Sequence, residues 1–171
     1  DFNKAETDYC YVNNPDNLNF SNAFSISAWI RMDYTDNAEY DIFNKYESAA
    51  NKGYKFYVNQ TTGAVVFKIC NSSSCTNVIN EAGLISDATT YHVTAVYDLG
   101  NDEATLYVYQ KGVGGVNTTT ANSLPTLVNT GVSNYPRIGN NFDGRIDQLK
   151  IYDRALTASE VWALNSQGEG Y

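Results

Sequence analysis

Short runs of alternating apolar and polar residues, separated by Asn, Asp and Gly, recur along the whole chain. A period of two suits a strand that buries one face and exposes the other. In segment 53–59, Tyr54, Phe56 and Val58 share one face, while Lys55 and Tyr57 share the other. The pattern predicts strands at 9–13, 24–32, 40–45, 53–59, 64–70, 75–80, 91–97, 103–110, 135–139 and 144–153.

Each of these strands offers one apolar face, so the sequence predicts an all-β sandwich of two stacked antiparallel sheets. The low-complexity segment 112–120 interrupts the pattern, and we expect it to be a loop. No internal repeat or linker is visible, and the 171 residues fit one domain spanning 1–171.

The end of the chain carries more specific signals. Asp143-Gly144 predicts a tight turn, because Gly accepts the positive φ that such turns need. A strand follows, with a break at Asp147-Gln148. Thr157 and Glu160 have capping-box spacing, flanked by Leu156 and Val161 as a hydrophobic staple, which predicts one helix at about 157–166.

Composition excludes some partners. A formal net charge of −8 argues against nucleic acids and anionic membrane surfaces, both of which require clustered Lys and Arg. No stretch approaches the roughly 20 apolar residues that span a bilayer. The chain begins with Asp, so we expect a processed form or an excised domain of a larger protein.

Four segments carry a family resemblance. The last runs from Asp143 to Glu160 as DGRIDQLKIYDRALTASE, and the others are LNFSNAFSISAWIR (18–31), YHVTAVYD (91–98) and ATLYVY (104–109). Together they resemble the laminin-G-like jelly-roll domains of the concanavalin A-like lectin/glucanase superfamily, over residues 1 to about 165. Cys10 in the opening strand and the long stretch 111–130 depart from the family pattern.

The superfamily that the chain resembles includes glucanases, which place two carboxylates on one face of a strand, one as nucleophile and one as acid. Glu39 and Asp41 are the nearest candidates, but the third acid of the family motif is missing. Asp143 and Asp147 lie within the structural signature instead. The single histidine, His92, lies where the family histidine packs structurally. We therefore expect no catalytic residues and no enzyme activity.

The resemblance also implies a structural calcium ion. In the family, the Asp at the position of Asp147 often helps to bind such an ion on the convex side, with Asp143 as a second candidate ligand. Hydrogen bonding of Asp147 to local backbone is an equal alternative. The acidic segment 33–41 lacks EF-hand spacing, and a solvated loop is the simpler interpretation.

Sugar binding is the commonest non-catalytic use of this family, and it needs aromatic rings beside hydrogen-bonding side chains. Tyrosine provides a flat apolar body with a polar tip. Alternation directs Tyr57, Tyr107 and Tyr109 away from the core, with Lys55 beside Tyr57, and places Tyr34, Tyr40 and Tyr46 on or beside a loop. The alternative is that outward tyrosines reflect strand propensity alone. We expect Trp29 and Trp162 to be core residues.

Cys70 and Cys75 flank a short polar turn, and we expect a disulfide between them, with two free thiols as the alternative. Cys10 is expected to be buried and inert. The Asn-X-Ser/Thr triplets at Asn59, Asn71 and Asn117 match chance expectation for so Asn-rich a chain.

The sequence thus favours a non-catalytic, secreted or cell-surface recognition module that binds a glycan or surface polysaccharide. A second hypothesis is a structural head or decoration domain of a surface filament, adhesin or virion, which contacts protein subunits. A glycan-degrading enzyme is the third.

Overall fold

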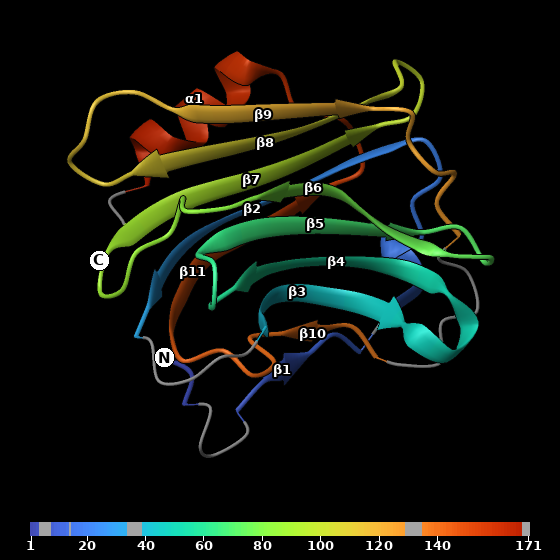
Figure 1. The fold of residues 1–171 in the computed structure, drawn as a ribbon, viewed down its shortest axis with the longest axis horizontal. Helices are drawn as coiled ribbons and strands as arrows, with labels where there is room; N and C mark the ends of the chain where they lie inside the picture. Colours follow the sequence, from blue (N-terminus) through green and yellow to red (C-terminus); the bar gives the residue numbers. More distant parts are fainter. Residues whose placement is uncertain (4–7, 14, 34–38, 129–134, 169–171) are drawn as a thin grey trace.

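The computed structural model describes residues 1–3, 8–13, 15–33, 39–128 and 135–168. Two antiparallel sheets are stacked face to face, and one helix lies outside them (Figure 1). The six-stranded sheet has the order β1-β10-β3-β4-β5-β6, and the five-stranded sheet has the order β11-β2-β7-β8-β9. The elements are β1 (Cys10–Tyr11), η2 (Pro15–Leu18), β2 (Ala23–Met32), β3 (Glu39–Glu47), η3 (Ser48–Ala50), β4 (Lys52–Asn59), β5 (Ala64–Cys70), β6 (Cys75–Glu81), β7 (Thr90–Asp98), β8 (Glu103–Gln110), β9 (Asn117–Asn122), β10 (Arg137–Ile138), β11 (Gly144–Tyr152) and α1 (Ala158–Gln167).

The jelly-roll prediction is confirmed, and one element departs from it. Segment 112–120 was expected to be a loop, but its second half opens β9, which pairs with β8 from Asn117↔Val108 to Asn122↔Glu103. This Thr-rich strand shows no apolar alternation because most of its side chains are exposed at the edge of the sheet. Backbone hydrogen bonds to β8 hold this segment as a strand, and a hydrophobic pattern does not reveal such bonds.

Aromatic side chains fill the space between the sheets. The Phe24 ring lies 4.6 Å from the ring of Tyr54 and 5.4 Å from that of Tyr97, centroid to centroid. Both tyrosine hydroxyls are satisfied, since Tyr54 Oη donates to Leu18 O and Tyr97 Oη donates to Pro125 O. Tyr40, expected on or beside a loop, is instead fully buried in β3 and belongs to this core.

The predicted break appears within β11, whereas the turn before this strand lies at Asn140-Asn141 and not at Asp143-Gly144. Gly144 has φ +128°, and a Cβ there would lie 2.2 Å from Arg31 O on the neighbouring β2. The register of β11 against β2 shifts between Asp147 and Lys150, and Gln148 has φ +49°. The break at Asp147-Gln148 is therefore a bulge in the strand.

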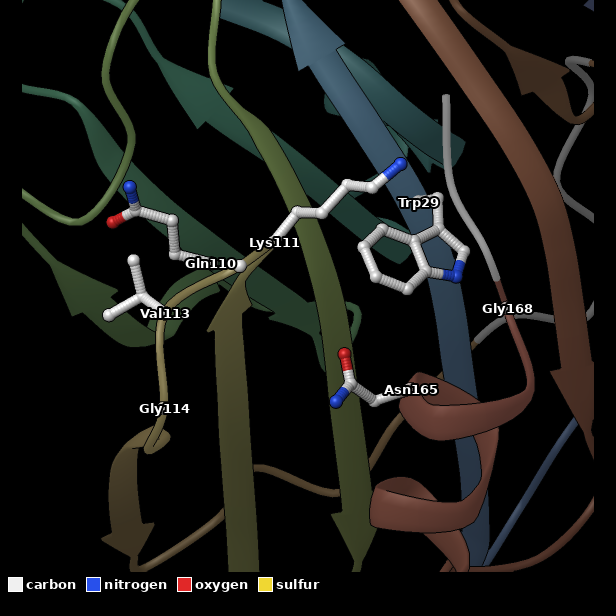
Figure 2. Close-up of a pocket in the computed structure, with 8 residues that line it drawn as sticks. Trp29, Gln110, Lys111, Val113, Gly114, Asn165 and Gly168 are labelled. Atoms are coloured by element: carbon white, nitrogen blue, oxygen red, sulfur yellow. The ribbon is translucent and has the colours of Figure 1, made fainter.

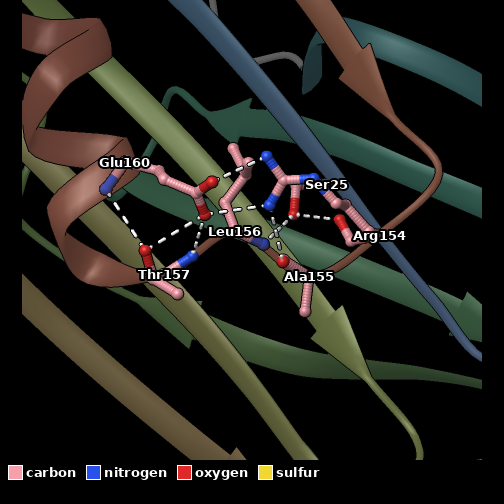
Figure 3. A network of polar contacts seen from close by, with 6 residues as sticks. All are labelled: Ser25, Arg154, Ala155, Leu156, Thr157 and Glu160. Carbon is pink, nitrogen blue, oxygen red and sulfur yellow. Dashed lines mark hydrogen bonds and ion pairs between the residues drawn. The ribbon is translucent and has the colours of Figure 1, made fainter.

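The capping box is present at the start of α1 (Figure 3). Glu160 N donates to Thr157 Oγ1, Thr157 N donates to Glu160 Oε2, and the Arg154 guanidinium donates to both Glu160 carboxylate oxygens at 2.9 and 2.7 Å. Ser25 of β2 fixes the entry to the helix, because its hydroxyl donates to Arg154 O and accepts from Leu156 N.

Helix α1 packs on the outer face of the five-stranded sheet. Leu156 and Val161 are buried together with Val96 of β7 and Tyr109 of β8. The prediction that Trp162 faces inward with Val161 is wrong, since Trp162 is 60% exposed. Successive helical positions point about 100° apart, so only one of the pair can face the sheet.

Cys70 and Cys75 form a disulfide across the β5–β6 hairpin, as predicted. The prediction for Cys10 is wrong: its thiol is free and exposed, because β1 is a two-residue strand at the edge of its sheet. Within the described part of the chain, no helix is long and apolar enough to cross a bilayer.

Candidate functional site

Tyrosines, amides and charged residues gather on the outer face of the six-stranded sheet. Residues of β4 alternate, so that Tyr54, Phe56 and Val58 fill the core while Lys55 and Tyr57 point outward. Helix α1 covers the outer face of the five-stranded sheet. Among the described residues, no α-helix covers the outer face of the six-stranded sheet. We call the side chains of this surface the tyrosine face, consisting of Tyr9, Tyr11, Glu39, Asp41, Asn44, Tyr46, Lys55, Tyr57, Lys68, Tyr135, Arg137 and Asn140.

A lysine bridges two carboxylates at the centre of this face. Lys55 Nζ lies 2.7 Å from Glu39 Oε2 and 2.7 Å from Asp41 Oδ1, and Asp41 is only 1% exposed. Burial raises the pKa of Asp41 even though Lys55 opposes the shift. Burial works against the charged form of Lys55, but Asp41 and Glu39 outweigh it and raise the Lys55 pKa. Both candidate acids of the sequence are therefore held in ion pairs.

Two ammonium groups lie close to the ring of Tyr57. Lys55 Nζ lies 4.5 Å and Lys68 Nζ 5.5 Å from its ring centroid, and Tyr57 is 3% exposed. Burial, together with the charge of Glu39, raises the pKa of the Tyr57 phenol. Tyr57 points away from the core as predicted, but its ring is packed against neighbouring side chains and is not accessible at the surface of the tyrosine face.

A chain of amides connects this ion cluster to an arginine. Asn44 Nδ2 and Asn140 Nδ2 both donate to Asp41 Oδ2, at 2.6 and 3.2 Å. Arg137 Nη1 in turn donates to Asn140 Oδ1 at 3.2 Å. The buried carboxylate thus orients two amides, and one of these orients the guanidinium.

An accessible part of the face is a hollow of about 70 Å³ lined by Asn44, Tyr46, Tyr135 and Arg137. Tyr135 and Tyr11 are each 59% exposed, with ring centroids 6.0 Å apart. The Arg137 guanidinium carbon lies 4.7 Å from the centroid of the Tyr9 ring. Exposed rings beside a cation and amides supply both apolar surface and directional hydrogen bonds.

The candidate ligand residues from the sequence are divided between two faces. Lys55 and Tyr57 lie on the tyrosine face, and Tyr34 lies outside the described residues. Tyr107 and Tyr109 lie on the opposite sheet, where both pack with helix α1. Tyr109 points away from the core between the sheets, as predicted, and the helix covers it to 8% exposure.

Four residues of the accessible hollow and its edge escaped the sequence analysis as ligands: Tyr9, Tyr11, Tyr135 and Arg137. The i, i+2 spacing of Tyr9 and Tyr11 was a visible signal, since it places two rings on one face of a strand. The pairing of Tyr11 with Arg137 joins segments 126 positions apart, and a hydrophobic pattern does not specify that register.

The remaining candidates have structural surroundings. The indole of Trp29 is buried as predicted, and its ring centroid lies 5.2 Å from that of His92. His92 Nε2 shares a 2.9 Å hydrogen bond with Ser27 Oγ, and burial, with the nearby Lys150, lowers the His92 pKa to about 4. This histidine is neutral at physiological pH.

Asp147, a predicted calcium ligand, makes a hydrogen bond with its neighbouring backbone. Asp147 Oδ1 accepts from the amide of Gln148 at 2.8 Å, which is the local backbone bond of the alternative interpretation. Among the described residues, no three or more His, Cys, Asp or Glu side chains are grouped as metal ligands. Asp143 and Asp147 remain predicted ligands.

Comparison with known proteins agrees with this architecture. The family model described as the concanavalin A-like lectin/glucanases superfamily matches residues 4–162. The chain belongs to this superfamily, in its laminin-G-like branch. No curated protein sequence matches the chain significantly.

Several solved structures share the fold at low identity. The carbohydrate-binding module CBM40 of the Ruminococcus gnavus IT-sialidase, bound to α2,3-sialyllactose, has a TM-score of 0.68 and 13% identity, covering 86% of this chain and 84% of that one. The binding domain of botulinum neurotoxin DC, in complex with rat synaptotagmin II, has a TM-score of 0.61 and 19% identity, covering 94% and 40%. The enzymatically active domain of bacteriophage CBA120 tailspike protein 2 has a TM-score of 0.63 and 8% identity, and the match covers 96% of this chain and 26% of that one.

Proposed function

We propose that this chain is a non-catalytic carbohydrate-binding module, and that its glycan binds at the exposed edge of the tyrosine face. The observation that carries the proposal is the hollow in which Tyr135 and Tyr46 lie beside the Arg137 guanidinium and the Asn44 amide. Pyranose rings stack on exposed aromatic rings, and their hydroxyls pair with amides and guanidinium groups.

Arg137 points to an acidic glycan. A guanidinium offers five donors, of which the described contacts use one for Asn140, and charge-assisted bonds to carboxylates are about twice as strong as neutral ones. The overall charge of −8 would otherwise repel such a ligand, so local positive charge has to supply the attraction. The structurally similar CBM40 was solved with a sialylated trisaccharide, which supports this choice.

The ion-paired state of Glu39 and Asp41 supports the non-catalytic part of the proposal. A retaining glycosidase needs one free nucleophilic carboxylate and one protonated acid. Here both carboxylates lie 2.7 Å from the same ammonium. The disulfide favours an oxidising, extracellular location.

The test is titration of the protein with 3′-sialyllactose and with lactose, in calcium and in chelator, read by calorimetry. We expect saturable binding of the sialylated sugar that is lost in Tyr135→Ala and kept in Trp162→Ala, which removes an exposed ring from helix α1. Equal loss in both variants would contradict the proposed location. Absence of binding to either sugar and to a glycan array would contradict the function itself and favour contacts with protein subunits.

A further inference from the structure

Polar side chains form a row across the strands of the tyrosine face. Strands β10, β3, β4 and β5 lie side by side in the six-stranded sheet (Figure 1). The directly paired residues along the row are Arg137↔Asn44, Asn44↔Lys55 and Lys55↔Lys68. Residues directly opposite each other point to the same side of a sheet, so these side chains share the outer face. The row continues to the exposed Asn77 on β6, which pairs with Lys68.

Two positive charges lie three strands apart in this row. Arg137 lines the hollow described above. Lys68 is the one residue of β5 that is not fully buried, and no carboxylate of the described residues forms an ion pair with its ammonium group. Three strand intervals of about 4.8 Å separate the backbones of Arg137 and Lys68, or roughly 14 Å. This separation exceeds the length of one sugar ring, so a ligand that contacts both must be an oligosaccharide.

The ring of Tyr46 connects the two charges. It lines the hollow together with Arg137, and its centroid lies 5.3 Å from Lys68 Nζ. A sugar that stacks on this ring therefore has a guanidinium group on one side and an ammonium group on the other.

The middle of the row has the opposite charge balance. Lys55 lies there, 2.7 Å from each of the carboxylates of Glu39 and Asp41, so two acids share one ammonium group. Glu39 is the more exposed of the two acids, with 44% of its side chain accessible. A negative group placed over the middle of the row would be repelled, whereas hydroxyls can pair with the Asn44 amide.

We infer that the tyrosine face binds a linear acidic polysaccharide in which charged sugars alternate with neutral ones, and that the polysaccharide lies across the strands. This inference rests on the proposed glycan binding at the hollow and adds a second anionic contact to it. Arg137 and Lys68 hold the carboxylates of two charged sugars, and a neutral sugar between them lies over Tyr46. A polymer that is charged on every sugar would place a carboxylate near Glu39.

The test is calorimetric titration with hyaluronan oligosaccharides, in which glucuronate alternates with neutral N-acetylglucosamine. The disaccharide carries one carboxylate and reaches one of the two cations, whereas the hexasaccharide reaches both. We expect affinity to rise about tenfold from the disaccharide to the hexasaccharide, the gain from one further charge-assisted contact. A galacturonate hexamer, which is charged on every sugar, should bind more weakly than the hyaluronan hexasaccharide.

The variant Lys68→Met isolates the second contact. Met keeps an apolar stem against the Tyr57 ring and removes only the charge. This variant should bind the hexasaccharide about tenfold more weakly than the parent and should keep its affinity for 3′-sialyllactose, whose single carboxylate needs Arg137 alone. Lys111→Met is the matched control. Lys111 lines a hollow with Trp29 between the β8–β9 turn and helix α1, next to the other sheet (Figure 2), so its loss should leave both ligands unaffected.

The outcomes separate this inference from the proposed function. Unchanged hexasaccharide binding in Lys68→Met, equal affinity for all hyaluronan lengths, or tighter binding of the galacturonate hexamer would overturn the inference and leave sialyllactose binding at Arg137 intact. Equal weakening in Lys68→Met and Lys111→Met would reduce the effect to net charge and would also overturn it. A parent protein that binds none of these sugars, sialyllactose included, would contradict the proposed function and this inference with it.

Discussion

Lys55 and Asp41 form a 2.7 Å ion pair on the outer face of a sheet, yet the Asp41 carboxylate is almost completely excluded from solvent. Two amides, from Asn44 and Asn140, donate to its other oxygen, Oδ2. The ion pair is therefore buried beneath the accessible surface. Removing only one partner of such a pair is strongly destabilising, because the other charge stays buried without compensation.

Replacing Lys55 by Met should destabilise the protein by about 3–5 kcal/mol, because Asp41 would be left buried without its counter-charge. The double variant Lys55→Met/Asp41→Asn should recover much of that loss, since no isolated charge remains. Urea unfolding of the single and double variants at neutral pH measures both values. If the single variant were as stable as the parent, Asp41 would not depend on Lys55.

Arg137→Gln should reduce the preference for sialyllactose over lactose by about tenfold, because one charge-assisted hydrogen bond is lost. Arg137→Lys should restore only part of it, since an ammonium keeps the charge but lacks the planar guanidinium that covers Tyr9. Calorimetry with both sugars separates the loss of preference from a general loss of affinity. An unchanged ratio in Arg137→Gln would exclude a carboxylate contact at this residue.

His92 makes stability depend on pH in a defined window. Its pKa falls from 6.5 to about 4 on folding, so the unfolded chain binds more protons between these values, and stability decreases as pH falls from 6.5 toward 4. The loss amounts to about 3 kcal/mol at the lower end. His92→Phe should flatten this window in a series of unfolding curves. A parent protein whose stability is constant between pH 6.5 and 4 would contradict the prediction.

The cap of helix α1 should titrate at lower pH. Hydrogen bonds from Arg154, and then from Thr157, lower the Glu160 pKa to about 2, so its contribution is complete above pH 4.5 and is lost as pH falls through the folded value. Thr157→Ala should cost about 1 kcal/mol at neutral pH, because the hydroxyl acceptor of the capping box is removed. Thermal unfolding measures the cost, with Thr119→Ala on strand β9 as a control for an ordinary Thr-to-Ala change.

Gly144→Ala should destabilise the protein by more than about 2 kcal/mol, because the new Cβ would lie 2.2 Å from Arg31 O in a backbone of φ +128°. Gly83→Ala is the matched control. It also has positive φ, at +74°, but a Cβ there meets no atom within 4 Å. The difference between the two variants measures the added cost of the close contact and of the less favourable φ at Gly144, and equal losses would show that neither adds to the cost of a positive φ.

Alternation and helix signals predicted most of this fold from single segments. The facing of β4, the bulge after Asp147 and the capping box at Thr157 are all local properties, and each was visible in the sequence. Strand β9 was missed because an exposed edge strand has no buried face to generate a pattern.

The candidate site was less predictable, because it depends on which segments meet. Alternation showed that Tyr57 and Tyr109 point away from the core. It did not show that lysine side chains would pack against Tyr57 or that helix α1 would cover Tyr109. Tyr11 and Arg137 become neighbours only through the pairing of β1 with β10. A single sequence specifies the direction of a side chain more readily than what covers it.

The free thiol of Cys10 makes the proposed site open to direct observation. Cys10 lies between Tyr9 and Tyr11 in the chain, and the alternation of the strand turns its side chain to the other side. Because the other two cysteines are joined in a disulfide, a maleimide dye would attach at one position. A fluorophore there would report ligand arrival at the tyrosines without occupying their surface.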